Sequence, residues 1–348
     1  MIRLPSRRRL ADPAPEAGRA HRPSAQRWAY VRARLLQAIP TIIVIVSCNF
    51  FFLHLAPGDP VDVLMGEAGA ATEAIREQLR VQFGLDRSLL EQYFAYLGAT
   101  LSFDLGYSYR YGSTNLELIL GRLSATMILM IGAFGVSVVL GSVGGLIAAV
   151  RRGTASAVAI MVATVVSYAS PLFWVGLMFI VVFAIKLGWF PTSGIARVGS
   201  DYTGWRYALD VAHHAVLPVL TLSLFYTALY ARLMRAAVLE NLKLAYVVTA
   251  RAKGLPPRKI MLRHVLRNAL LPVLTMAGVQ VSGMLGGSVV IESVFGWPGL
   301  GLLAFESLFA RDLNLLLGIL FLTCILVVLT NIVVDVAYTL VDPRVVLR

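Results

Sequence analysis

Residues 245–272 read AYVVTARAKGLPPRKIMLRHVLRNALLP and form the longest polar interruption in the second half of the chain. Apolar runs long enough to cross a lipid bilayer lie on either side of it. Small residues follow a helical spacing as far as Lys253, and Gly254 then supplies a residue that adopts positive φ and ends a helix. Pro256 and Pro257 suit the first turn of another helix. The stretch therefore predicts a short helix, a sharp turn and a second helix, all outside the membrane.

Basic residues recur every four positions on that second helix, at Lys259, Arg263 and Arg267, and are expected to form one stripe. A short helix with small side chains lets the surface of another protein come close. Its fixed exit angle would pass a push from that protein to the flanking membrane helices. The alternative is a loop that is basic only because basic residues favour the cytoplasmic side of a membrane. The pattern by itself leaves both interpretations open.

The composition places the chain in a membrane. Of its 348 residues 58% are hydrophobic and only 14% are charged, whereas a soluble domain is about half apolar and a quarter charged. Both cysteines, Cys48 and Cys324, lie inside apolar runs, which argues against a disulfide framework or a cysteine metal site. We therefore expect an all-α polytopic membrane protein.

Six charge-free runs cover residues 35–55, 125–150, 156–185, 215–231, 269–291 and 315–334. Most of them reach the ~20 residues that cross the hydrocarbon layer as a helix. The fourth run is the shortest, and we expect its helix to extend back through His213 and His214. The sequence thus predicts six transmembrane helices within a membrane domain of residues 35–348.

Lysine and arginine are distributed unevenly among the segments that join these runs. Residues 1–34, the turn at Arg151 and Arg152, the loop of residues 232–268 and the C-terminus hold 22 of the 31. By the positive-inside rule, both termini and the 232–268 loop are cytoplasmic. The net charge of +12 therefore sets the orientation, and we expect no nucleic-acid partner.

Two long segments lie outside the runs. Residues 1–34 contain nine arginines and four prolines, which predicts a disordered cytoplasmic tail attracted to the lipid surface, with a targeting segment as the competing interpretation. Residues 56–121 form an acidic loop on the outer, periplasmic side. Helical spacing over residues 71–83 and 89–97 predicts a small helical cap there.

Several motifs resemble one transporter family. Residues 249–254, TARAKG, followed by Leu271 and Pro272, resemble the cytoplasmic coupling-loop signature of ABC importer permeases, in the variant of the dipeptide, oligopeptide and nickel permeases. Val248 departs from the general signature, which has a glutamate there. Further similar stretches lie in order along residues 29–348: HLAPGDP at 54–60, FGLD at 83–86, DLG at 104–106, GWFP at 188–191, FGWPGLG at 295–301 and DPR at 342–344.

The resemblance implies that this chain is the permease subunit of an ATP-driven importer for di- or oligopeptides or a related small solute, in the bacterial inner membrane. It implies that the coupling loop docks into a separate ATPase subunit through Tyr246, Thr249, Ala250, Arg251, Ala252, Lys253, Gly254 and Leu255. The implied partners are a second homologous permease, two ATPase subunits and a solute-binding protein outside. ATP and Mg are expected on the ATPases, and no cofactor on this chain.

The absence of catalytic motifs agrees with this interpretation. The chain contains no phosphate loop, no H-E-x-x-H, no C-x-x-C and no G-x-S-x-G, so we expect a translocation subunit and not an enzyme. An ion-driven secondary transporter is the alternative, but it needs ionisable groups at the middle of its spans, and this chain has almost none there. An intramembrane enzyme would need a convergent nucleophile or metal constellation.

Polar residues within spans are candidates for the substrate path, because buried polar groups are costly in a membrane. Gln280 and Ser282 lie in the fifth run, Glu292 at its outer end and Asn331 in the sixth run. Glycine pairs four residues apart, at Gly141 and Gly145 and at 283 and 287, predict close helix packing. The sequence does not say which helix each pair contacts.

Overall fold

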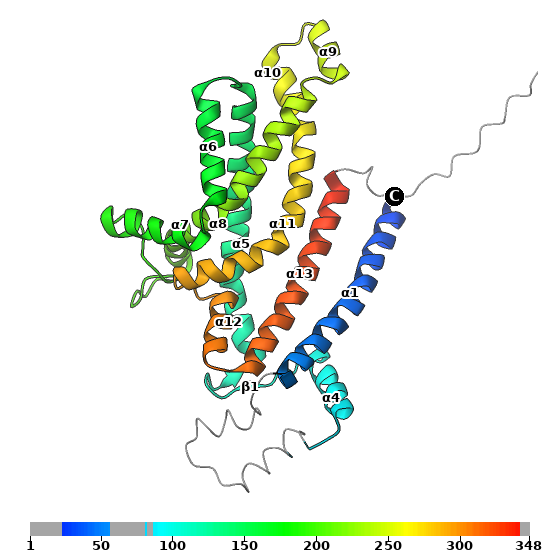
Figure 1. The fold of residues 1–348 in the computed structure, drawn as a ribbon, viewed down its shortest axis with the longest axis vertical. Coiled ribbons are helices and arrows are strands. Elements are labelled where there is room, and N and C mark those ends of the chain that lie inside the picture. The colour runs from blue at the N-terminus through cyan, green and yellow to red at the C-terminus, as the bar shows by residue number, and fades with distance from the viewer. Residues whose placement is uncertain (1–22, 56–80, 82–85, 342–348) are drawn as a thin grey trace, which may run out of the picture.

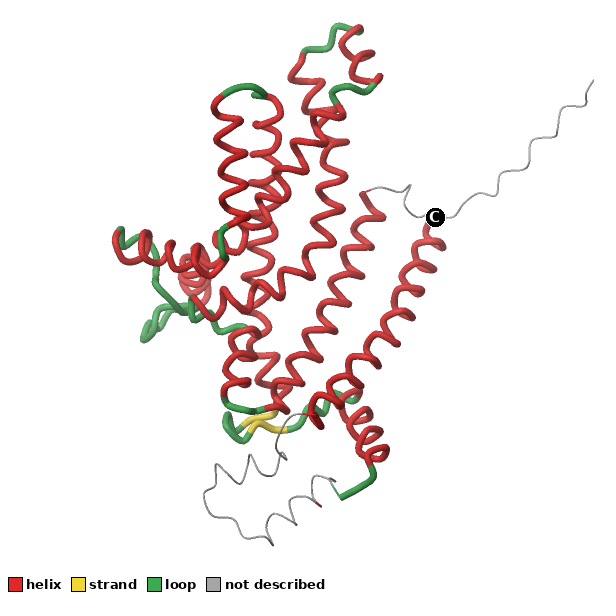
Figure 2. Tube along the Cα trace, viewed as in Figure 1, coloured by secondary structure: helices red, strands yellow, loops and turns green. Residues whose placement is uncertain are grey.

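The structure is a computed structural model and describes residues 23–55, 81 and 86–341. Most of the described chain is helical (Figures 1 and 2). The helices are α1 (Pro23–Leu55), α4 (Leu89–Leu101), α5 (Asn115–Val150), α6 (Ala155–Ala169), α7 (Leu172–Phe179), α8 (Gly204–Asn241), α9 (Ala245–Ala252), α10 (Pro257–Lys259), α11 (Leu266–Val294), α12 (Leu300–Phe309) and α13 (Leu313–Val341). Two π-helices, η1 (Ile180–Lys186) and η2 (Ile260–Val265), continue α7 and α10, and the short strands β1 (Tyr107–Ser108) and β2 (Ser113–Thr114) pair antiparallel.

Four stretches of the described chain are helical, long and apolar enough to cross a membrane: Asn115–Val150, Gly204–Asn241, Pro257–Val294 and Leu313–Val334. The pair formed by α6 and α7 with η1 adds a fifth if it counts as one broken span. The apolar part of α1, Leu36–Phe52, is shorter. The fourth predicted helix does extend back through both histidines, since α8 begins at Gly204. The expectation of an all-α polytopic membrane protein is confirmed to this extent.

The third predicted span is not one straight helix. Residues 156–185 divide at Ser170 and Pro171 into α6 and the α7–η1 segment. The angle of the bend between these two segments is 109°. Pro171 disfavours the helical conformation for the residue before it. Ser170 accordingly has φ −80° and ψ 135° and ends α6. The charge-free composition conceals this break, because an uncharged proline does not interrupt a charge-free run.

The bundle is packed most closely where α5 crosses α8. A Cβ on Gly141 would stand 2.6 Å from the Tyr230 Cβ and 3.0 Å from the Thr227 carbonyl oxygen. A Cβ on Gly145 would overlap the Ala231 carbonyl oxygen. The glycine pair therefore lets the two backbones approach, as the spacing predicted, and the helix it contacts is α8.

The elements divide between two ends of the bundle. The start of α1, the end of α13, the α5–α6 turn and α9 lie at one end, and α4, α12 and the β1–β2 hairpin lie at the other (Figure 1).

Several helix boundaries in the structure differ from those predicted from the sequence. Residues 23–34 are helical and belong to α1, not to a disordered tail, and residues 115–121 belong to α5, not to the outer loop. Residues 232–241 belong to α8, so the loop is shorter than 232–268.

At the end of the bundle opposite α9, side-chain hydrogen bonds hold the β1–β2 hairpin against neighbouring elements. Ser108 Oγ donates to Asp312 Oδ2 at 2.5 Å, and the Tyr111 hydroxyl donates to Glu306 Oε2 at 3.1 Å, so the hairpin is fixed to α12 and α13. The predicted helix over residues 89–97 is present as α4, which starts with a capping box of Ser88 and Glu91. The other predicted helix, over residues 71–83, lies outside the described residues apart from residue 81.

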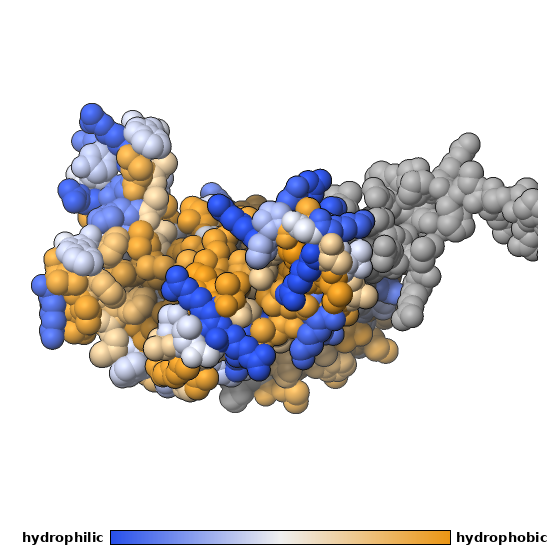
Figure 3. All heavy atoms as spheres, turned by 90° about the horizontal axis from the view of Figure 1, so that it is seen from above, coloured by the Kyte–Doolittle hydropathy of each residue, from blue (hydrophilic) through white to orange (hydrophobic). Residues whose placement is uncertain are grey.

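The flank of the bundle is apolar. Ile131, Val139 and Val333 are 69%, 59% and 66% exposed, and large exposed apolar surfaces in soluble monomers are rare. Seen from the end that carries α9, hydrophilic side chains lie among apolar ones (Figure 3). Such an apolar flank is the surface that a bilayer requires.

Candidate coupling loop and translocation path

The predicted helix–turn–helix is present after α8. Leu244 is extended, with φ −76° and ψ 149°, and α9 follows at once. The helix ends where Gly254 takes φ +74°. At that end the Lys253 amide donates to the Thr249 carbonyl at 3.0 Å and the Leu255 amide donates to the Ala250 carbonyl at 3.3 Å. A glycine in the left-handed region after the last turn is the usual way to satisfy these carbonyls.

One face of α9 is anchored to the rest of the protein. Val247 is fully buried and Ala250 is 7% exposed, and both belong to the main hydrophobic core. The Tyr246 hydroxyl donates to Asn241 Oδ1 at 2.7 Å, which ties α9 to the last turn of α8. Ala250 and Tyr246, predicted as partner-binding residues, therefore support the loop from inside. The sequence did not reveal this, because an alanine suits a buried helix contact as well as an exposed one.

The other face of α9 is open. Five of the predicted partner-binding residues are exposed, and Leu255 is half-buried. The exposed residues are Thr249, Arg251, Ala252, Lys253 and Gly254. A Cβ on Gly254 would meet nothing within 4 Å. The result is a small, basic surface that leads away from the bundle on a rigid helix.

The basic stripe of the second helix is also exposed. Lys259, Arg263 and Arg267 face solvent, while Ile260 and Val265 are 3% and 0% exposed and pack into the core. The sequence predicted an ordinary helix here, but residues 260–265 form the π-helix η2. A π-helix has more residues per turn than an α-helix, so residues four apart stay close to one line along it.

We expect Gly254→Val to loosen the turn after α9. The left-handed conformation costs an ordinary residue roughly 1–2 kcal/mol, and β-branched residues tolerate it least. Since open space surrounds the position, the cost comes from φ alone. Limited trypsin digestion at Arg251 and Lys253 should speed up about tenfold. Gly254→Asn is the control, because asparagine tolerates positive φ, and equal digestion of the two variants would contradict this account.

The candidates for the substrate path separate into different roles. Ser282 Oγ donates to Asn331 Oδ1 at 2.6 Å, which links α11 to α13. Gln280 is half-buried, and its Oε1 and the Tyr226 hydroxyl oxygen both lie 3.9 Å from where a Cβ would stand on Gly283. The Tyr226 hydroxyl of α8 and the Gln280 amide of α11 thus both lie beside Gly283. Sequence reasoning missed Tyr226 because a tyrosine inside an apolar run does not interrupt the hydropathy.

Glu292 does not lie on an open path. It is fully buried, and its carboxyl oxygens accept hydrogen bonds from Thr126 Oγ1 at 2.8 Å and from the amides of Gly301 and Leu302 at 2.6 and 3.1 Å. Those amides belong to the first turn of α12, where backbone N–H groups lack helical partners and a negative group is favoured. Glu292 therefore caps α12 and joins it to α5, a structural role that differs from the predicted substrate contact.

The FGWPGLG stretch of residues 295–301 explains why this glutamate can be buried. The Trp297 Nε1–H donates to the Ala125 carbonyl at 2.8 Å, and Trp297 is fully buried. A Cβ on Gly299 or Gly301 would collide with the Glu292 carboxyl group. The glycines thus make room for the carboxyl group over the start of α12. Among the described residues, no group of three or more His, Cys, Asp or Glu is arranged to hold a metal ion.

Two family descriptions match nearly the whole chain. Residues 141–347 match the binding-protein-dependent transport system inner membrane component, and residues 28–130 match the N-terminal membrane component of the same systems. The oligopeptide transport system permease protein AppB of Bacillus subtilis is 35% identical over 318 residues, which cover 91% of this chain and 99% of that protein. The di/tripeptide transport system permease protein DppB of Pseudomonas aeruginosa is 36% identical over 331 residues, covering 91% and 98%.

The fold has a counterpart among solved structures. An inward-facing structure of the MetNI methionine ABC transporter covers 68% of this chain and all of its own chain, with a TM-score of 0.52 and 18% sequence identity. At that identity the likeness concerns the fold alone. The family matches and the two permeases confirm the resemblance found in the coupling-loop signature. The chain belongs to the binding-protein-dependent transport system inner membrane components, the permease subunits of ABC importers.

Proposed function

We propose that this permease carries di- or oligopeptides inward and that α9 is where a separate ATPase drives it. The single observation that carries the coupling role is the division of α9 into two faces. Val247 and Ala250 fix one face in the core, while Ala252 and Lys253 present the other to solvent. A partner that binds the exposed face thereby acts on the ends of α8 and η2, to which α9 is attached. The peptide substrate is supported by the transport systems to which the related AppB and DppB belong.

We further propose six spans, with α1 as the first and the α6–α7–η1 pair as the third. The end that carries α9 then faces the cytoplasm, and so do both chain termini. This orientation is supported by the basic residues at that end, among them Arg151, Arg152 and Arg263. The opposite end, with α4 and α12, faces the periplasm and the solute-binding protein. A second permease and two ATPases, which carry ATP and Mg, complete the transporter.

The polar groups beside Gly283, between α8 and α11, are our candidate for contact with the substrate. Gln280 and Tyr226 offer an amide and a hydroxyl beside Gly283, groups that suit the backbone of a peptide because both donate and accept hydrogen bonds. Ser282 and Asn331 already bond to each other. We therefore assign them to holding α11 against α13, and we withdraw Glu292 from the path.

Replacing Ala252 by tryptophan tests the coupling role. The side chain is exposed, so we expect the variant to reach the membrane in normal amount and to keep its fold. The bulk blocks a close-fitting partner, and a misfit at the centre of an interface costs about 2 kcal/mol or more, or at least about thirtyfold in affinity. Co-purification of the ATPase subunits and ATP-dependent uptake of a labelled tripeptide into vesicles should both be lost.

Ala155→Trp is the matched control, since Ala155 is an exposed alanine at the same end of the bundle. It should retain both the ATPase and the uptake. Normal uptake by the Ala252 variant would refute the coupling role. If the Ala252 variant lost uptake but still bound the ATPase, the substitution would impair a step that follows ATPase binding. That result would also contradict the role of this face in binding.

A further inference from the structure

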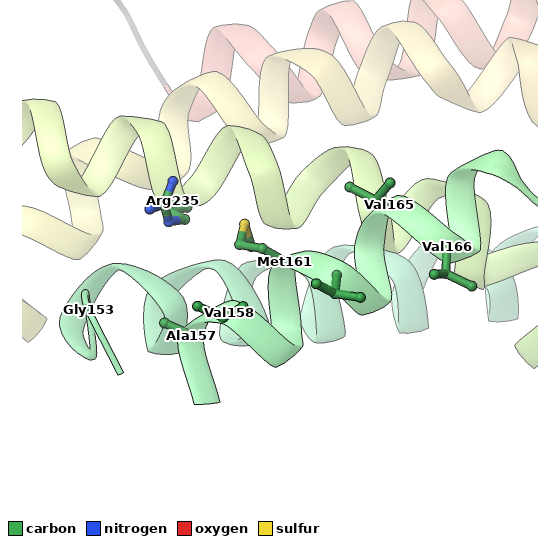
Figure 4. A pocket seen from close by; sticks show the side chains of 8 residues that line it. Gly153, Ala157, Val158, Met161, Val165, Val166 and Arg235 are labelled. Atoms are coloured by element: carbon green, nitrogen blue, oxygen red, sulfur yellow. The ribbon is translucent and has the colours of Figure 1, made fainter. Parts of the chain in front are cut away.

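An open groove lies between α6 and α8, close to the α5–α6 turn (Figure 4). Its volume is about 350 Å³. Apart from Gly153 and one charged residue, its lining is Ala157, Val158, Met161, Val162, Val165 and Val166. Three of the valines, at positions 158, 162 and 166, are 60%, 54% and 58% exposed. The groove therefore opens on the apolar flank of the bundle and not into its core.

The charged residue is Arg235 of α8, which lines the groove near Gly153 (Figure 4). Its Nε is buried and has no hydrogen-bond partner among the described residues. Buried polar atoms are almost always paired, so an unpaired guanidinium nitrogen requires an explanation. One turn earlier, Arg232 lies over the ring of Tyr168, with 4.7 Å between its Cζ and the ring centroid. Arg232 thus has a partner within the chain, whereas the Arg235 Nε has none in the described part of it.

We propose that this groove binds a phospholipid with an anionic headgroup. The phosphate pairs with the Arg235 guanidinium, whose planar set of donors matches phosphate oxygens. One acyl chain lies along the exposed valines of α6, whose apolar side chains have no hydrogen-bonding groups to satisfy. Arg151 and Arg152, exposed in the adjoining turn, add positive charge at the same end. Basic pockets between transmembrane helices at the cytoplasmic surface are suited to such headgroups.

Charge complementarity selects the lipid over other occupants. A purely apolar protein helix would fill the wall but would offer the Arg235 guanidinium no acceptor. A zwitterionic lipid would fit the wall equally well, but the excess of positive charge favours a headgroup with net negative charge. Only the choice of the cytoplasmic leaflet rests on the orientation proposed above. The site itself depends on the groove and on Arg235.

The test is photolabelling of the intact transporter, purified with its partner subunits and placed in phosphatidylcholine vesicles. A small fraction of the lipid carries a photoactivatable acyl chain, attached either to phosphatidylglycerol or to phosphatidylcholine. Mass spectrometry of the labelled peptides then compares the two probes on α6. Since one basic residue near the surface contributes about fivefold in anionic lipid binding, phosphatidylglycerol should label α6 at least fivefold more strongly.

Two variants separate the headgroup contact from the acyl-chain contact. Arg235→Gln should reduce the preference for phosphatidylglycerol about fivefold, while both probes still label α6. Val162→Trp fills the groove from an exposed position and should reduce labelling by both probes. The matched controls are Arg206→Gln, exposed near the far end of α8, and Val143→Trp, 49% exposed on α5. Neither control should change the labelling of α6.

Equal labelling of α6 by both probes in the unaltered protein would overturn the proposal. So would an unchanged preference in Arg235→Gln, or an absence of label on α6 because a partner protein covers the groove. None of these readouts measures transport. Failure of the lipid site and failure of the proposed transport function are therefore distinguishable.

Discussion

Replacing Gly145 by leucine is expected to remove most of the folded protein. A Cβ at this position would overlap the Ala231 carbonyl oxygen and stand 2.7 Å from the Met234 Cβ, and the leucine branches would extend further into α8. Backbone and Cβ atoms cannot rotate away, so α5 and α8 must separate. Overpacking costs about 1–3 kcal/mol when side chains can adjust, and a backbone clash exceeds that range. Size-exclusion chromatography of a fluorescent fusion should show at least a tenfold loss of the monodisperse peak.

Gly135→Leu is the matched control on the same helix. Gly135 is exposed, and a Cβ there would meet nothing within 4 Å. The same substitution should therefore leave the peak close to its original height, and leucine also has the higher helix propensity. Similar losses in both variants would mean that glycine is needed for some property of α5 other than contact with α8.

Replacing Glu292 by leucine is expected to have the second large effect. The leucine would leave the Gly301 and Leu302 amides and the Thr126 hydroxyl without their acceptors. Each buried unsatisfied group costs about 1–3 kcal/mol, so the three together represent a severe loss. We expect α12 to detach from α5 and α11, and the melting temperature of the purified protein to fall by about 10 °C or more.

Two further substitutions test this prediction: Glu292→Gln is expected to have an intermediate effect, and Glu306→Leu is the control. The glutamine retains one acceptor oxygen and should lie between the native protein and Glu292→Leu. Glu306 lies on α12 itself, is half-buried and accepts one hydrogen bond from Tyr111. Its loss should cost about 1 kcal/mol and lower the melting temperature by only a few degrees. A Glu292→Leu protein as stable as the Glu306→Leu protein would show that the cap of α12 is dispensable.

The sequence predicted the features that repeat a simple pattern. Apolar runs gave the long helices, and a glycine followed by two prolines gave the turn after α9, because these signals depend on local conformation and solvation alone. The break at Pro171 follows the same local rule, but a charge-free run conceals it. A glycine pair predicted a close helix contact, although only the fold could identify α8 as its partner.

The roles of single polar residues were harder to predict. Glu292 at the outer end of an apolar run indicated function, but its hydrogen-bond partners include Thr126, which lies far away in the sequence. Ala250 was assigned to a partner surface, whereas it faces the core. Whether a residue points inward depends on the packing of the whole bundle, and a hydropathy pattern contains no such information.

The anchoring of α9 also affects the energetics of its association with another protein. A loop that is disordered before it binds must lose conformational entropy, and this loss weakens the complex. Val247 in the core and the bond from Tyr246 to Asn241 already hold α9 in one shape. The exposed face of this eight-residue helix is therefore preorganised. A modest contact area can then give useful affinity and still release quickly, as a subunit that works in repeated cycles requires.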